Sequence, residues 1–278
     1  MVKQLAGSSG LVKSLLPGSL LRLPLRLLSP TMTVRIIYGA LHGKKWIVGS
    51  AIHRCWLGLY EHAKQRLIVR EVRENTVFWD VGANVGFYTL LASMLVGSGK
   101  VFAFEPVPRN LSYLKKHLAL NEVVNAEVLP LAISDKNGSS SFETEDSGFM
   151  GRLSDQGRLL VSTATLDGLV DEGKVLPPDY VKIDIEGAEL FALRGARQTF
   201  QRFHPTLFLA THGRQVEREC CELLESWGYE WQCIQGASGE LGEIFARHNG
   251  NKHPGTISER SRKPFSLSGL KTQKDASS

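Results

Sequence analysis

Residues 76–89 constrain the fold more than any other stretch of this 278-residue chain. The segment reads Thr-Val-Phe-Trp-Asp-Val-Gly-Ala-Asn-Val-Gly-Phe-Tyr-Thr, an apolar run that breaks at an acid and two glycines. Apolar residues then return at the three-and-four spacing of a helix packed on a sheet. The pattern predicts a buried parallel strand, a tight turn through Gly82 and Gly86, and a helix start. Free N–H groups at such a helix start favour an anionic ligand group.

Two acids near this turn narrow the choice of ligand. A dinucleotide fingerprint needs three glycines in the order G-x-G-x-x-G, but Asn84 stands where the middle glycine is required. Asp80 at the strand tip would repel a pyrophosphate and suit an ammonium group. The next predicted strand ends in Glu105, which is placed to accept hydrogen bonds from ribose hydroxyls. An amino acid joined to a nucleoside without phosphates describes S-adenosylmethionine, and a nicotinamide cofactor is disfavoured.

Five motifs make the chain similar to the FkbM-type methyltransferases, and they occur in the family's order within residues 44–247. They are Asp80-Val81-Gly82-Ala83-Asn84-Val85-Gly86-Phe87-Tyr88-Thr89, Phe104-Glu105-Pro106, Ala132-Ile133-Ser134-Asp135, Thr165-Leu166-Asp167 and Lys182-Ile183-Asp184-Ile185-Glu186-Gly187-Ala188-Glu189. The resemblance implies a class I methyltransferase fold. It also implies methyl transfer, most often to a hydroxyl on a sugar or a secondary metabolite.

Strand and helix patterns alternate along the rest of the chain. We therefore expect an α/β fold, doubly wound and Rossmann-like, with a mostly parallel seven-stranded sheet and an antiparallel edge strand. The expected elements include a strand at 126–133, a polar loop at 145–160, a strand at 180–185, a helix at 188–200, and a closing antiparallel pair at 230–234 and 241–247.

Ligands of doubly wound sheets bind beyond the carboxyl ends of the strands, and this rule selects the candidate site. The candidate cofactor-binding residues are Asp80, Gly82, Ala83, Asn84, Gly86, Glu105, Ser134 and Asp184. The candidate catalytic residues are Asp184, Glu186 and His212, because transfer to a hydroxyl needs alignment and a group that accepts a proton. Asp80 could instead cap the turn, and Glu186 could cap the following helix.

The identity of the base is open at this level. Members of the resembling family commonly carry an acid where Thr211-His212 stands, so Asp184 is slightly favoured over His212, with Glu186 and Glu61 as alternatives. Asp184 and Glu186 would also suit a divalent cation. No third ligand stands at a convincing spacing, so no metal is expected. Asp167 is expected to cap a short helix rather than touch a ligand.

Charge is unevenly distributed, although Lys and Arg exceed the acids by only five overall. Residues 1–60 contain eight bases and no acid, whereas the middle of the chain is acidic. We predict a basic, leucine-rich leader at 1–43, a cap segment at 44–75, the S-adenosylmethionine-binding domain at 76–247 and a disordered basic tail at 248–278.

The leader has two interpretations. Charged residues and two prolines interrupt its apolar residues, so no span of about 20 apolar residues exists to cross a bilayer. It could lie on an anionic membrane surface, or it could be poorly ordered without a specific role, which the prolines favour.

The cap segment mixes aromatic and polar residues just before the first core strand. One interpretation makes it a lid over the cofactor cleft, with Tyr60 and Glu61 nearest the site. The other, which is favoured, has Trp46, Trp56 and Tyr60 simply docking the segment on the core.

The four cysteines, Cys55, Cys220, Cys221 and Cys233, form no C-x-x-C pair and have no histidine at ligand spacing. Neither a disulfide framework nor a zinc site is indicated, which fits a reducing cytoplasm.

The predicted function is S-adenosylmethionine-dependent O-methylation of a hydroxyl on a carbohydrate, glycolipid or secondary-metabolite acceptor. An N-methyltransferase acting on an amine or protein side chain is the first alternative, and a non-catalytic cofactor-binding module is the second. The expected partner is a small molecule or glycan, with no nucleic acid. The expected location is cytoplasmic, with peripheral membrane contact as an open alternative.

Overall fold

The computed structural model describes residues 28–144, 151–153, 157, 159–234 and 242–250. Predictions for most of the leader, part of the polar loop and the tail after residue 250 concern residues outside these ranges.

The described residues build a seven-stranded sheet in the order β12-β13-β11-β10-β3-β4-β5. The bounds are β3 Val77–Val81, β4 Lys100–Phe104, β5 Ala126–Leu129, β10 Tyr180–Ile183, β11 Thr206–Ala210, β12 Tyr229–Cys233 and β13 Glu243–His248. Strands β5, β4, β3, β10 and β11 are parallel. Their nearly continuous apolar runs suit strands covered on both faces. The predicted doubly wound α/β fold is confirmed.

The antiparallel strand lies one position inside the sheet, not at the edge as predicted. β13 pairs antiparallel with β11 on one side and with β12 on the other, so β12 forms the edge. The burial pattern explains this order: Ile244, Phe245 and Ala246 of β13 are fully buried, whereas Glu230 of β12 is exposed. An apolar strand is stable between two neighbouring strands. A strand with exposed polar residues is better suited to the edge of the sheet, where one side faces solvent.

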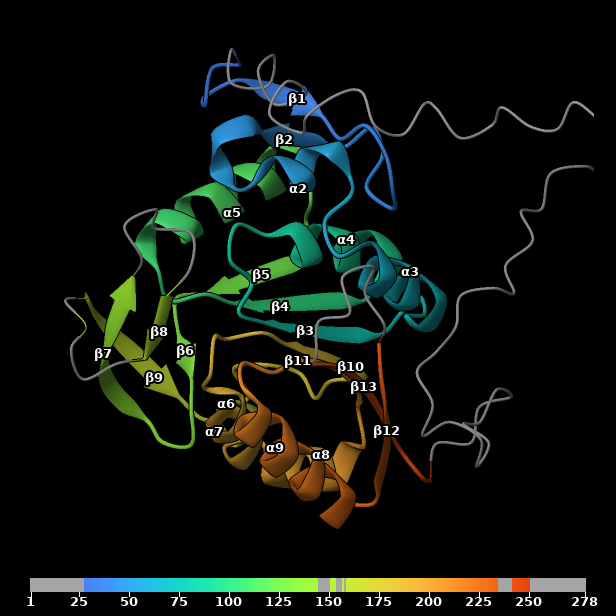
Figure 1. The fold of residues 1–278 in the computed structure, drawn as a ribbon, viewed down its shortest axis with the longest axis vertical. Coiled ribbons are helices and arrows are strands. Elements are labelled where there is room, and N and C mark those ends of the chain that lie inside the picture. The colour runs from blue at the N-terminus through green and yellow to red at the C-terminus, as the bar shows by residue number, and fades with distance from the viewer. Residues whose placement is uncertain (1–27, 145–150, 154–156, 158, 235–241, 251–278) are drawn as a thin grey trace, which may run out of the picture.

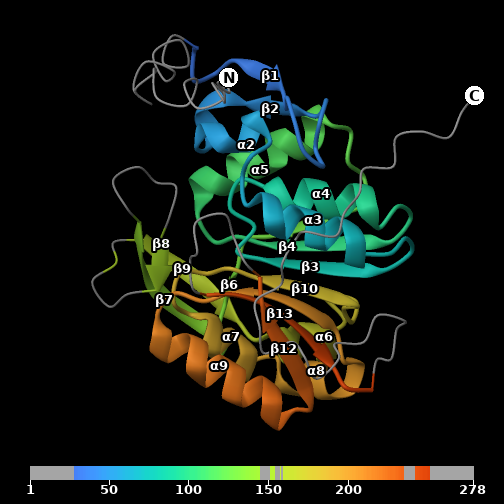
Figure 2. The ribbon, with the colours of Figure 1, turned by 45° about the vertical axis from the view of Figure 1, so that its right-hand side comes forward.

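Two helical layers enclose the sheet (Figure 1 and Figure 2). On one face lie α3 (His62–Glu71), α4 (Phe87–Leu95) and α5 (Pro108–Leu120). On the other face lie α6 (Leu166–Asp171), α7 (Glu189–Arg194), α8 (Arg197–Phe203) and α9 (Arg214–Ser226). Each layer buries its own apolar cluster against the sheet, one including Leu90 and Phe208 and the other including Leu193 and Phe200.

Two predicted elements are each divided in the structure. The strand expected at 126–133 ends at Leu129, and Pro130, which has no N–H to donate, precedes the separate strand β6 (Ala132–Ile133). The helix expected at 188–200 is divided at Gly195 into α7 and α8. A Cβ on Gly195 would lie 2.1 Å from the carbonyl oxygen of Ser134, so this close approach requires glycine.

A second sheet projects from the domain, with the strand order β6-β9-β7-β8. Its other strands are β7 (Gly138–Thr144), β8 (Gly151–Leu153) and β9 (Leu159–Ala164). The prediction of a loop at 145–160 is wrong at residues 151–153, which form β8, and at residues 159–160, which begin β9.

The cap begins earlier in the chain than predicted. β1 (Thr33–Arg35) pairs with β2 (Lys45–Ile47), and Ile36 and Leu41 are fully buried, so the predicted leader boundary at residue 43 is wrong for this part. The chain continues through a short 3-10 helix (Val48–Ser50) and α2 (His53–Leu57) into α3. The ring of Trp46 stacks on that of His117 from α5 at 3.8 Å between centroids, which docks the cap on the core.

None of the helices in the described residues is both long enough and apolar enough to cross a lipid bilayer.

Candidate functional site

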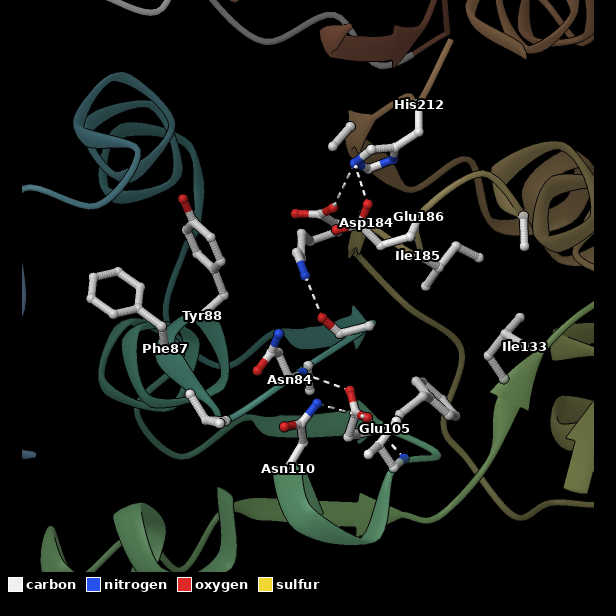
Figure 3. A pocket seen from close by; sticks show the side chains of 18 of the residues that line it. Asn84, Phe87, Tyr88, Glu105, Asn110, Ile133, Asp184, Ile185, Glu186 and His212 are labelled. Atoms are coloured by element: carbon white, nitrogen blue, oxygen red, sulfur yellow. Dashed lines mark hydrogen bonds and ion pairs between the residues drawn. The ribbon is translucent and has the colours of Figure 1, made fainter. Parts of the chain in front are cut away.

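A cavity of about 430 Å³ opens at the carboxyl ends of the central strands, where doubly wound folds bind their ligands. Figure 3 shows its two ends. Asn84, Glu105 and Asn110 lie at one end, and Asp184, Glu186 and His212 lie at the other. The turn after β3 and the aromatic side chains of Tyr60, Phe87 and Tyr88 contribute to the wall between them.

The turn after β3 depends on backbone conformations that favour glycine. Gly82 has a φ of +78°, and a Cβ there would lie 1.9 Å from the carbonyl oxygen of Asp184. Gly86 has a φ of +94° and is the N-cap residue of α4. Asn84 adopts the left-handed conformation with a φ of +50°, which asparagine tolerates better than most residues. The glycine positions selected from sequence therefore hold the turn in place.

Glu105 is buried beside this turn, and its carboxylate is fixed by donors from three residues. The backbone N–H of Asn84 donates to Oε2 at 2.8 Å, and that of Val107 donates to Oε1 at 2.9 Å. The Asn110 side-chain amide donates to Oε1 at 3.4 Å. Burial raises the pKa of Glu105, while these hydrogen bonds oppose the rise. A carboxylate can accept about four hydrogen bonds, so capacity remains for a ligand.

Three predicted cofactor residues lie outside the described lining of the cavity: Asp80, Gly86 and Ser134. Asp80 is fully buried on β3, where it accepts a hydrogen bond from the Thr89 hydroxyl at 2.6 Å. Its carboxylate also pairs with Lys182, which stands directly opposite on β10, at 3.1 Å. Lys182 Nζ in turn donates to the carbonyl oxygen of Gly82 at 2.8 Å. Asp80 thus supports the turn indirectly, through Lys182.

The opposite end gathers three carboxylates around one imidazole. His212 Nε2 lies 3.2 Å from Glu186 Oε2 and 3.9 Å from Asp184 Oδ1. Its Nδ1 lies 2.9 Å from Oε1 of Glu189, a carboxylate that is fully buried. Glu189 Oε1 also accepts from the backbone N–H groups of Ile185 and Gly187. The hydrogen bond with Glu189 raises the pKa of His212 to about 9, despite partial burial.

This geometry corrects the reason for expecting no metal. One ligand atom each from Asp184, Glu186 and His212 lies within 4.8 Å of the others, a grouping that could hold a metal ion. His212 would therefore be the third ligand that sequence spacing did not reveal. It comes from the end of β11, whereas the acids follow β10, so only the pairing of these strands unites them.

A buried lysine, Lys64, joins the cap to this end of the cavity. Its Nζ lies 2.8 Å from Glu61, 2.6 Å from Glu243 and 3.7 Å from Asp184. Burial would lower the pKa of Lys64, but Asp184, Glu61 and Glu243 outweigh it and raise the pKa. Burial raises the pKa of Glu243 to about 7 although Lys64 opposes the rise.

Lys64 also affects Asp184. Burial would raise the pKa of Asp184, but Lys64 and Lys182 outweigh it and hold the pKa below its ordinary value. Sequence reasoning missed Lys64 and Glu243. The spacing of Glu61 and Lys64, three residues apart, was an available signal for the first. Glu243 had no local signal.

The two interpretations of the cap are both supported by its contacts. Trp46 and Trp56 are buried in the core, as the docking interpretation predicted. Tyr60 and Glu61 line the cavity, as the lid interpretation predicted. Glu61 also accepts a hydrogen bond from the Tyr88 hydroxyl at 2.7 Å.

Comparisons with known proteins agree with the motifs. The model of the methyltransferase FkbM domain matches residues 80–248. The hexuronic acid methyltransferase AglP of Haloferax volcanii is 34% identical over 49% of this chain and 56% of its own length. The methyltransferase sdnD of Sordaria araneosa is 28% identical over 46% of this chain and 62% of its own length. This chain therefore matches less than two thirds of either relative.

A solved structure supports the fold. The crystal structure of a methyltransferase FkbM from Methylobacillus flagellatus aligns with a TM-score of 0.50 and 18% identity, over 63% of this chain and 44% of that one. The predicted resemblance and the Rossmann-like methyltransferase fold are confirmed.

Proposed function

Because the chain belongs to the FkbM methyltransferase domain family, we propose that it transfers a methyl group from S-adenosylmethionine to a hydroxyl of a carbohydrate. The observation that carries the proposal is one cavity with two chemically different ends. It joins the Asn84 and Glu105 end to the acidic end at Asp184, Glu186 and His212. A cofactor at the first end would thereby face an acceptor at the second.

The residues at the first end fit S-adenosylmethionine. Glu105 retains acceptor capacity for ribose hydroxyls, and the turn of Gly82, Ala83 and Asn84 lines the cavity. Asp184 lies where the turn meets the acidic end, and carboxylates there suit an ammonium group. Asp80, Gly86 and Ser134 are proposed to support these contacts rather than to make them.

S-adenosylmethionine supplies an electrophilic methyl group on a positively charged sulfur. The role of the protein is to align an acceptor oxygen with that carbon and to help remove its proton. Alignment alone can supply about 7–11 kcal/mol, and a positioned base a further 10²–10⁴-fold, roughly. We assign acceptor positioning and proton removal to the cluster of Asp184, Glu186 and His212. Tyr60, Phe87 and Tyr88 would exclude water beside it.

The acceptor class is proposed from similarity. AglP is named for methylating a hexuronic acid, so a carbohydrate hydroxyl is the preferred acceptor and an acidic sugar is the first to test. An amine or a protein side chain is the alternative acceptor. A cofactor-binding module without catalysis is the remaining alternative.

Methyl-labelled S-adenosylmethionine separates these candidates. We expect label on uronic acid glycosides, less on neutral sugar glycosides and none on primary amines, and the Asp184→Asn variant should label none. Labelling of amines alone would support the N-methyltransferase. Calorimetric binding of the cofactor without labelling of any acceptor would support the binding module.

We further propose that the reaction takes place in the cytoplasm at an anionic membrane surface, reached through the basic N-terminal region. Residues 1–60 contain no acid, and the described cap exposes the apolar side chains of Ile37, Tyr38 and Ile52. Ile52 also lines the cavity, so the exposed apolar side chains include one at the site. Basic and apolar groups together favour anionic interfaces. The four cysteines are free, which suits a reducing compartment.

Vesicle sedimentation tests the membrane proposal. The full chain should bind vesicles containing phosphatidylglycerol better than pure phosphatidylcholine vesicles, and removal of residues 1–27 should weaken that binding while labelling activity in solution persists. Equal binding of both forms to both vesicles would contradict it.

A further inference from the structure

We propose that Asp184, Glu186 and His212 bind a divalent cation of the Mn²⁺ class at the acidic end of the cavity. The ion is held by one carboxylate oxygen from each acid and by Nε2 of the imidazole. The three ligand atoms lie within 4.8 Å of one another. Their arrangement, the residue that orients the imidazole and the local charge each support the site.

The ligand atoms have nearly the separation that one ion requires. Metal bonds of about 2.0–2.2 Å to oxygen or nitrogen place neighbouring ligand atoms about 3.0–3.5 Å apart. His212 Nε2 lies 3.2 Å from Glu186 Oε2 and 3.9 Å from Asp184 Oδ1. The distance from Nε2 to Asp184 has to shorten, and the two carboxylate oxygens lie within 4.8 Å of each other and have to come within bonding range of the same ion. Both acids line the cavity, where their side chains have room to rotate. Small side-chain rotations therefore complete the site.

Glu189 orients the imidazole as a carboxylate that accepts from the other ring nitrogen orients a metal-binding histidine. Its Oε1 lies 2.9 Å from Nδ1 of His212 and is fixed by the backbone N–H groups of Ile185 and Gly187. The side chain is fully buried, and its Oε2 has no hydrogen-bond partner within the described residues. When Nδ1–H donates to Glu189, the lone pair of Nε2 points toward Asp184 and Glu186. A cation bound at Nε2 takes the place of the proton that this nitrogen otherwise carries.

The local charge also calls for a cation. Lys64 lies 3.7 Å from Asp184, and Lys182, which pairs with Asp80, also attracts the Asp184 carboxylate. Within the described part of the chain, Lys64 contacts Glu61, Asp184 and Glu243, and His212 contacts Glu186, Glu189 and Asp184. Carboxylates that leave bulk water need compensating charge, and these five carboxylates outnumber the two lysines and the imidazole near them. A divalent ion between Asp184 and Glu186 would supply the missing positive charge.

The donor set indicates the class of ion. Two carboxylates with one imidazole combine a hard oxygen set with a nitrogen that favours transition metals, which suits Mn²⁺ better than Ca²⁺. Three protein ligands leave coordination positions open toward the cavity. Resting on the proposed function, these positions would take the acceptor hydroxyl together with a neighbouring oxygen of the sugar, which an acidic sugar readily provides.

Manganese binding tests the site without any reaction. Purified full chain is stripped with EDTA and titrated with Mn²⁺, and free ion is followed by electron paramagnetic resonance in the absence of S-adenosylmethionine and acceptor. We expect one Mn²⁺ per chain, with affinity reduced by about 10-fold or more in Glu186→Gln and in His212→Gln. Glu189→Gln should weaken binding about 10–100-fold, as losses of orienting partners do. His42→Gln and Glu222→Gln, both exposed and remote from the cluster, should bind as the unaltered chain does.

The proposal is overturned if no ion binds at millimolar Mn²⁺, or if the cluster variants bind as tightly as the two controls. Circular dichroism melts establish that each variant is folded, so a lost site is not mistaken for a lost fold. Because the readout involves neither cofactor nor acceptor, binding of Mn²⁺ by a chain that labels no acceptor would contradict the proposed function and leave the metal site standing.

Discussion

The two ends of the cavity are built in different ways. The cofactor end comes from one stretch of chain, from Gly82 to Asn110, and the donors that hold Glu105 are two backbone N–H groups and one amide. The acidic end draws its charged side chains from the cap, from the segment after β10, from the end of β11 and from the start of β13. A local motif therefore defines the first end, and only the completed tertiary structure defines the second.

The two ends of the cavity also differ in how their buried charges are compensated. The cofactor end holds one buried carboxylate, and uncharged donors satisfy it. The acidic end holds several carboxylates that share two lysines and one imidazole. Changes at the first end should therefore alter affinity by moderate amounts, whereas changes at the second should alter turnover strongly.

The largest expected effect is at Asp184. Asp184→Asn keeps the size of the side chain but removes the charge that faces Lys64 and His212. We expect the rate of labelling to fall by about 10³-fold or more, or about 4 kcal/mol, with a smaller loss of cofactor affinity because Asp184 is also proposed to face the ammonium group. Asp171→Asn, an exposed acid at the end of α6, is the control and should retain full rate. Unchanged turnover in Asp184→Asn would place the chemistry at another group.

The next effect concerns Gly82, where the two ends touch. Gly82→Ala would force a Cβ to within 1.9 Å of the Asp184 carbonyl oxygen in a backbone conformation with a φ of +78°. We expect the free energy of unfolding to fall by about 3 kcal/mol or more, measured by urea denaturation. Gly173→Ala has a similar φ of +66° but nothing within 4 Å, so it should cost only about 1 kcal/mol of conformational strain. Equal losses of unfolding free energy in both variants would mean that the backbone at Asp184 moves away from the added Cβ at little cost.

A pH-dependent effect comes from His117, which joins α5 of the cofactor end to the cap. The backbone N–H of Ile47 donates to its Nε2, and its Nδ1 bonds the Val85 carbonyl oxygen. Burial lowers the pKa of His117 to about 4, although the hydrogen bond to Val85 opposes the shift. The folded pKa is below the ordinary value of 6.5, so the unfolded chain takes up the proton more readily. The contribution of His117 to the free energy of unfolding is present above about pH 6.5 and is lost as the pH falls from about 6.5 to 4.

This loss should amount to about 3 kcal/mol, which is the free energy equivalent of the pKa difference. It is measured as the change in unfolding free energy with pH relative to His117→Gln, which should lack this component. His42→Gln, at an exposed position in the cap, should keep the full dependence. Parallel curves for the unaltered chain and His117→Gln would show that the imidazole does not carry the effect.

The smallest of the four effects is at Glu105. Glu105→Gln removes a charge while retaining one acceptor oxygen, so S-adenosylmethionine should bind about 10-fold more weakly, or about 1.4 kcal/mol. Calorimetry supplies the dissociation constants, and turnover at saturating cofactor should change little. Glu127→Gln, exposed on β5, should bind normally. A turnover loss that exceeds the affinity loss would break the distinction between the two ends.

Sequence patterns were sufficient for the first end because its information is local. Glycine spacing at Gly82 and Gly86 reflects conformations within one turn, and Glu105 follows directly from the end of an apolar strand. Periodicity likewise predicted the alternation of strands and helices along the chain, because apolar runs and helical spacing are properties of single segments.

Other features required knowledge of which segments become neighbours. Asp80 was predicted to contact the ligand, because the sequence around an acid at a strand tip does not show which side chain it pairs with. In the structure, Lys182 lies opposite Asp80 in the register of β3 and β10 and forms an ion pair with it. A lone charge inside each of two apolar strands was the signal available for that pair. The place of β13 inside the sheet also depends on pairing, since a hairpin strand can add to an edge or insert beside it.

The pairing of Lys64 with Glu243 connects the cap to the last strand of the sheet, at 2.6 Å. A ribosome delivers the cap before the sheet and β13 after the other six strands of the sheet, because the chain is made from the N-terminus. Until β13 inserts between β11 and β12, Lys64 lacks one of its counter-charges and the cavity lacks one wall. A nascent chain that stops short of residue 243 therefore carries every glycine of the turn without a finished site. Ligand binding can therefore stabilise the folded domain only after the whole domain has left the ribosome.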